Sequence, residues 1–235
     1  MTSTVRSAAI PVAGGSGSAT RLYRVAGVSA LVGAVAYLVQ PVVVFVVNPP
    51  TTGPGGYPVA TDLIGLRTLA PLEIVEFTTI GVATIVLAVA VYRLAVLRRE
   101  RTSIPLQLGA ILGVLAGCGW IAAAASILST YGLFATNLAE ITSDETLQQV
   151  AIQGALLGSG LLCIPIFGMA GWFVLLATSG RRQGVVGWPL AVVAFAVTAV
   201  IAFPAAVLLV PFGIIVLIPA FVTFGVAFLV KGRSA

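Results

Sequence analysis

Long apolar stretches limit how this chain can fold more strongly than any motif it contains. Six stretches, at about 22–47, 69–94, 104–128, 148–178, 185–203 and 212–230, consist mostly of apolar residues. A helix rises 1.5 Å per residue, so segments of this length can cross the roughly 30 Å hydrocarbon core of a bilayer. Only 8% of the residues are charged, against about a quarter in soluble domains. The sequence predicts an all-α, polytopic transmembrane helix bundle with six spans.

The segments outside the spans indicate how the bundle is organised. Residues 1–20 are rich in Ser, Thr, Gly and Ala and predict a flexible cytoplasmic tail, which leaves 21–235 as a single transmembrane bundle. Prolines and glycines in 48–68 indicate the first long loop. Thr142-Ser143-Asp144-Glu145 has the spacing of a capping box at the start of span four.

The joint between spans five and six has no polar turn, because 203–212 reads Phe-Pro-Ala-Ala-Val-Leu-Leu-Val-Pro-Phe. Backbone exposed to hydrocarbon must be hydrogen-bonded internally. We therefore expect either a turn buried against protein or a single interfacial or re-entrant hairpin in place of two complete spans.

The distribution of basic residues predicts the orientation. Cytoplasmic loops of membrane proteins carry an excess of Lys and Arg. Six spans place Arg67 alone on one side and the other eleven basic residues on the side of the N-terminus: Arg6, Arg21, Arg24, Arg93, Arg98, Arg99, Arg101, Arg181, Arg182, Lys231 and Arg233. We expect a multi-pass protein of a bacterial-type cytoplasmic membrane, with both termini in the cytoplasm.

Several classes of chemistry are excluded or disfavoured. The chain has no histidine, which removes imidazole bases, Ser-His and Cys-His dyads and the usual zinc sites. Cys118 and Cys163 lie within apolar runs and are expected to be small buried side chains. Because the basic residues are dispersed between spans, nucleic acid is not an expected partner, and no metal or cofactor is predicted.

Two acidic residues fall within a predicted span, Glu73 and Glu76 in span two. Their spacing of three places them on nearly one helix face. A charge at the centre of a membrane costs at least ~2.5 kcal/mol, so an ionisable residue there is a functional candidate by default. Glu76 is the deeper of the two.

Other polar side chains are predicted at about the same membrane level, near the outer ends of spans one, three and four. We expect an outward-facing polar pocket with Glu76 at its base and Glu73 near its rim, whose ligand-binding residues include Gln40, Ser126, Tyr131, Gln149 and Gln153. In the structural alternative, Glu73 pairs with Arg67, and a protonated Glu76 hydrogen-bonds to Gln40, which contributes roughly 0.6 to 2 kcal/mol.

Small residues predict where helices approach closely. Gly109, Gly113 and Gly117 recur at intervals of four in span three, and Gly154 and Gly158 do so in span four. Such spacing favours close packing of these two helices or, alternatively, a homodimer face.

Three functional hypotheses follow. The first is a protein that binds or transports a small or lipophilic solute through the pocket around Glu76, with a carboxyl that can exchange a proton. The second is an accessory or structural subunit that binds a partner chain as well as the lipid bilayer. The third is a membrane-embedded enzyme on a lipid or isoprenoid-like substrate, with Glu76 as general acid and Glu73 as its electrostatic partner. The sequence does not decide whether the chain is an enzyme.

Short segments along the chain carry a resemblance. They are Arg24-Val25-Ala26-Gly27 in span one, a glutamate early in span two, Arg98-Arg99 after it and Leu229-Val230-Lys231-Gly232 at the end. With this layout the chain resembles a family of actinobacterial six-helix membrane proteins of unknown function. The resemblance implies a fold and no activity.

Overall fold

The computed structural model describes residues 15–42, 60–98, 103–129, 144–206 and 210–234, and these form helices and no strand. The helices are α1 (Gly15–Val42), α2 (Ala60–Arg98), α3 (Ile104–Ile127), α5 (Asp144–Leu175), α6 (Trp188–Ala206) and α7 (Val210–Ser234), and α5 continues into a π-helical turn at Leu176–Gly180. Within the described residues, five helices are long and apolar enough to cross a membrane, and α6 has a shorter apolar stretch. The predicted all-helical bundle is confirmed.

The contacts between the helices close them into a ring. Each packs against the next in the order α1, α2, α3, α5, α6, α7, and α7 returns to pack against α1. Large side chains fill the interior of this ring and are almost completely buried, among them Tyr37, Trp120, Phe173, Phe221, Phe224 and Phe228. The ring is therefore a packed core and not an open pore.

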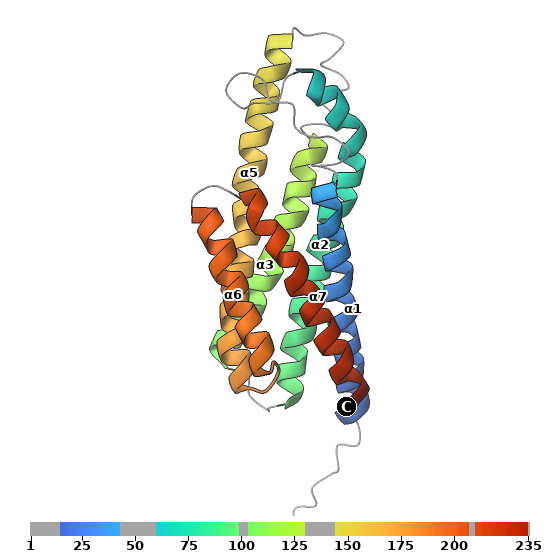
Figure 1. The fold of residues 1–235 in the computed structure, drawn as a ribbon, viewed down its shortest axis with the longest axis vertical. Coiled ribbons are helices and arrows are strands. Elements are labelled where there is room, and N and C mark those ends of the chain that lie inside the picture. The colour runs from blue at the N-terminus through green and yellow to red at the C-terminus, as the bar shows by residue number, and fades with distance from the viewer. Residues whose placement is uncertain (1–14, 43–59, 99–102, 130–143, 207–209, 235) are drawn as a thin grey trace, which may run out of the picture.

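The basic side chains that the structure describes gather at one end of the ring, which we call the basic end. There α1 and α6 begin, and α2, α5 and α7 end (Figure 1). Hydrogen bonds join several of these segments, because Arg98 of α2 donates to Tyr23 of α1 and Lys231 of α7 donates to Val185. The first and last described residues consequently lie at the same end.

Helix boundaries differ from the predicted spans where polar residues continue a helix. α3 begins at Ile104 as predicted, with Ser103 as its N-cap. α1 begins at Gly15, inside the predicted tail. The N–H groups of a first helical turn have no acceptor within the helix, so small polar residues are well tolerated there. α2 begins at Ala60, well before 69, since charged residues that would be excluded from hydrocarbon are still compatible with a helix.

The turn before α6 follows from two local features. Gly184 has a φ of 72°, in the left-handed region that glycine adopts without a steric penalty. α6 then begins at Trp188 rather than at 185, because Pro189 is favoured in a first turn. The joint between α6 and α7, at 207–209, lies outside the described residues, so the buried-turn and hairpin alternatives stay predictions.

Two glycines bring α2 and α3 into backbone contact. A Cβ atom at Gly81 would lie 2.6 Å from the carbonyl oxygen of Gly117, and one at Gly117 would lie 2.6 Å from that of Gly81. α3 does pack against α5 as predicted, and Gly109 faces Leu175 there. Gly117, however, faces α2, because glycines four apart drift around the helix. What surrounds Gly154 and Gly158 in α5 lies outside what the structure describes.

Candidate functional site

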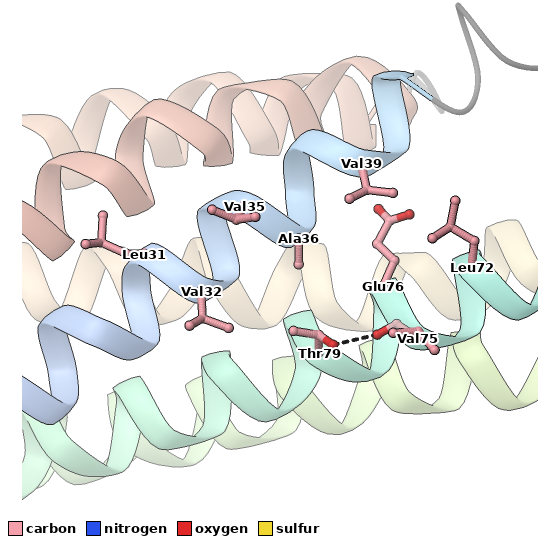
Figure 2. Close-up of a pocket in the computed structure, with 9 residues that line it drawn as sticks. All are labelled: Leu31, Val32, Val35, Ala36, Val39, Leu72, Val75, Glu76 and Thr79. Atoms are coloured by element: carbon pink, nitrogen blue, oxygen red, sulfur yellow. Dashed lines mark hydrogen bonds between the residues drawn. The ribbon is translucent and has the colours of Figure 1, made fainter.

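A groove between α1 and α2 contains the intramembrane carboxyl of Glu76 (Figure 2). Its volume is about 390 Å³. The α1 wall is aliphatic, and the α2 wall adds two aliphatic residues, one hydroxyl and the carboxyl: Leu31, Val32, Val35, Ala36 and Val39 face Leu72, Val75, Glu76 and Thr79. Because Val32, Val35, Leu72 and Val75 are exposed on the outer surface of the ring, the groove opens sideways.

Glu76 is positioned by its helix to point inward. Its side chain is only 3% exposed, and Figure 2 shows the carboxyl extending from α2 toward α1, beside Val39. Thr79, one turn along, donates its hydroxyl to the carbonyl of Val75 at 2.7 Å, so this hydroxyl is already satisfied within α2. Among the residues that line the groove, Glu76 is therefore the one with an ionisable side chain.

The predicted neighbours of Glu76 are only partly placed. Glu73 is half-buried on α2 but does not line the groove. Gln40 lies in the last turn of α1, but its side chain, like that of Arg67, lies outside the described residues. The Glu76–Gln40 hydrogen bond and the Glu73–Arg67 ion pair consequently stay predictions.

Of the remaining predicted ligand-binding residues, those that the structure describes do not line this groove. Ser126 is buried on α3, whereas Gln149 and Gln153 are exposed on α5. Tyr131 lies outside the described residues. The sequence predicts only the level of these side chains along the membrane, whereas the rotation of each helix determines which side of the ring they face. The groove that contains Glu76 is thus apolar around one carboxyl, and the wider polar pocket stays a prediction.

A cluster of buried polar atoms lies behind Glu76 in the core. The hydroxyl of Tyr37 on α1 lies close to the Thr84 hydroxyl on α2 and the Trp120 N–H on α3, and it interacts electrostatically with Glu76. None of the Tyr37, Thr84 and Trp120 polar atoms makes a hydrogen bond of ordinary geometry within the described part of the chain. Contacts between aromatic rings hold the cluster instead. The Tyr37 and Trp120 rings pack edge to face, with their centroids 5.6 Å apart.

We expect Tyr37→Phe to leave the thermal stability of the purified protein unchanged or slightly raised. The substitution keeps the ring contacts and removes a buried hydroxyl that makes no hydrogen bond of ordinary geometry. Tyr23→Phe is the matched control, because the Tyr23 hydroxyl accepts a hydrogen bond from Arg98 at 2.6 Å and its loss should cost about 1 kcal/mol or more. Melting temperatures in one detergent compare the two, and an equal loss in both would contradict the expectation.

The residues that form the groove wall on α1 gave no signal in the sequence. Val32, Val35 and Val39 are ordinary residues of an apolar span, and only the packing of α1 against α2 brings them opposite Glu76. Tyr37 could have been found, because a hydroxyl in the middle of a span at the level of a tryptophan and a threonine suggests a polar cluster. The three valines of the α1 wall, by contrast, can be identified only once the structure is known.

Comparisons of the chain with models of protein families, with curated proteins and with solved structures find no match. The resemblance to the actinobacterial family therefore stays a prediction. The geometry of the groove is the basis for assigning a function.

Proposed function

We propose that this chain is a six-span protein of a bacterial-type cytoplasmic membrane, with both termini on the cytoplasmic side. The 19 residues of α6 correspond to about 28 Å, close to the roughly 30 Å of hydrocarbon. α1 begins and α7 ends at the basic end, which an even number of spans requires. The positive-inside rule assigns that end to the cytoplasm.

We further propose that the protein binds a lipophilic solute that enters the groove between α1 and α2 from the membrane. The observation that carries this proposal is a carboxyl, only 3% exposed, in a groove that is otherwise almost entirely aliphatic. A single well-placed polar group within an apolar pocket is the usual arrangement for orienting a small ligand. Glu76 then recognises the one polar or cationic end of the solute.

The form of the groove favours this function over the two other hypotheses. An aliphatic wall offers little to a fully polar solute but matches an alkyl chain or ring system. For the enzyme hypothesis, Glu73 does not share the groove with Glu76, so its electrostatic partnership is not supported. An accessory subunit that only packs against a partner would not need a carboxyl in a groove open to lipid.

Photolabelling with a lipophilic probe tests the proposal. A long-chain aliphatic amine carrying a diazirine on its chain is incubated with the protein in lipid nanodiscs, irradiated and located by peptide mass spectrometry. We expect saturable labelling of groove residues on α1 and α2, and a loss of most of that labelling in Val75→Trp. The indole would fill the groove, because Val75 lines it and is 62% exposed.

Val89→Trp is the matched control, since Val89 is also on α2 and 44% exposed but does not line the groove. Labelling that is retained in Val89→Trp and lost in Val75→Trp supports the proposed site. Labelling that does not saturate, or that is spread evenly over the outer surface and unchanged by Val75→Trp, would overturn it and favour the accessory-subunit hypothesis.

A further inference from the structure

Two cations from different helices converge on the turn that precedes α6. Arg98 of α2 donates through Nη1 to the carbonyl oxygen of Gly184 and through Nη2 to the Tyr23 hydroxyl at 2.6 Å. Lys231 of α7 donates to the neighbouring carbonyl, that of Val185, at 3.3 Å. Adjacent carbonyls of one turn thus hold both charges at the basic end.

The positive charge of this pair is not offset within the described part of the chain. Arg98 and Lys231 lie close enough for their charges to act on each other, and the groups that accept their hydrogen bonds are neutral. The carboxylates whose side chains are described, Glu73, Glu76 and Glu145, lie in the first halves of α2 and α5, toward the opposite end. Two like charges with unused N–H donors favour an anion between them.

A tryptophan directly after this turn indicates the level at which this anion would lie. Trp188 is 58% exposed at the start of α6, and the guanidinium of Arg181 lies 4.3 Å from the centre of its ring. Exposed tryptophans of membrane proteins concentrate at the headgroup level, and a cation over the ring face is attracted to it. The turn and the two cations therefore lie where lipid phosphates are.

We propose that Arg98 and Lys231 bind the phosphate of an anionic phospholipid at the basic end of the bundle. The turn at 181–187 positions both cations, and the Arg181–Trp188 pair holds that turn at the membrane interface. This site is separate from the groove around Glu76 and does not depend on the function proposed for it. The bound lipid fastens α2, the turn and α7 together.

Native mass spectrometry of the delipidated protein tests this site. The protein is mixed in detergent with phosphatidylglycerol or phosphatidylcholine, and the fraction carrying one lipid is measured against lipid concentration. We expect tighter binding of phosphatidylglycerol and a roughly five- to tenfold weaker affinity in Lys231→Gln, in line with the loss of one cation near a headgroup. Lys231→Arg should keep the affinity.

Arg233→Gln is the control with the same loss of charge, because Arg233 is exposed two residues further along α7. We expect less than a twofold change. Equal weakening in Lys231→Gln and Arg233→Gln would show a diffuse charge effect and overturn the site, as would equal affinity for the two lipids. If Lys231→Gln does not fold, Arg98→Gln provides the same test.

Inorganic phosphate distinguishes a lipid headgroup from a soluble phosphate. Phosphate alone should not displace phosphatidylglycerol at millimolar concentration, because it lacks the acyl chains that hold the headgroup at this level. Displacement at submillimolar phosphate would overturn the lipid assignment.

Glu100, which lies outside the described residues, is the carboxylate nearest in sequence to Arg98. If Glu100 neutralised the charges of Arg98 and Lys231, the protein would show no preference for phosphatidylglycerol over phosphatidylcholine.

Discussion

Glu76→Gln should weaken binding of a long-chain aliphatic amine to the protein by roughly tenfold to a hundredfold. A hydrogen bond to a charged group contributes about 1.5–3 kcal/mol, which corresponds to that range of affinity. Glutamine keeps the size of the side chain but cannot carry the negative charge. Equilibrium binding of a radiolabelled amine to protein in nanodiscs measures the change, and competition by unlabelled amine corrects for partitioning into lipid.

Two comparisons separate recognition by the carboxyl from a change in the shape of the groove. An alkane of equal length without a head group should bind the wild type and Glu76→Gln within about threefold of each other, because it makes only apolar contacts. Thr79→Val should bind the amine like the wild type, since the Thr79 hydroxyl already donates to Val75 within α2. Equal loss of the alkane and the amine in Glu76→Gln would contradict a role in recognition.

The class and membrane character of the fold could be predicted because they depend on hydrophobicity alone. α3 shows this most clearly, since its apolar run and its predicted start at Ile104 agree with the structure. The start of α2 at Ala60 could not be obtained in this way. Hydropathy reports which residues can lie in hydrocarbon, whereas a helix can continue into water as long as its backbone hydrogen bonds continue.

In the proposed site, the sequence singles out the carboxyl but not the side chains that surround it. Placing an acidic residue in a membrane span costs free energy whichever way the helix is rotated about its axis, so Glu76 could be singled out from the sequence. Which side chains lie opposite Glu76 depends on the rotation of the helices and on how closely they approach. That information lies in the small residues between the helices, such as Gly81 and Gly117 where α2 meets α3.

Gly81→Leu should prevent the bundle from folding, and Gly81→Ala should lower its stability by roughly 1 to 3 kcal/mol, the usual cost of inserting a methyl group into a close-packed contact. A Cβ atom there would lie 2.6 Å from the carbonyl oxygen of Gly117 and 2.7 Å from Cγ1 of Ile121. The first of these is backbone, which cannot rotate aside, so α2 and α3 must separate. Thermal unfolding in detergent measures the loss.

Gly160→Ala is the control, because a Cβ atom at this position in α5 would meet no atom of the described residues within 4 Å. Alanine also favours a helix over glycine by up to about 1 kcal/mol, so the stability of this variant should be unchanged or raised. A loss in Gly160→Ala equal to that in Gly81→Ala would show that the fold is sensitive to any change at a helical glycine rather than to this contact.

The double variant Gly81→Ala/Gly117→Ala tests the contact itself. Each Cβ atom would meet the carbonyl oxygen of the other glycine, so both substitutions require the same separation of α2 from α3. Once the first substitution has moved the helices apart, the second costs little more. The double variant should therefore lose less stability than the sum of the losses in the two single variants. Additive losses would mean that the two methyl groups are accommodated independently, and that these glycines do not form one shared contact.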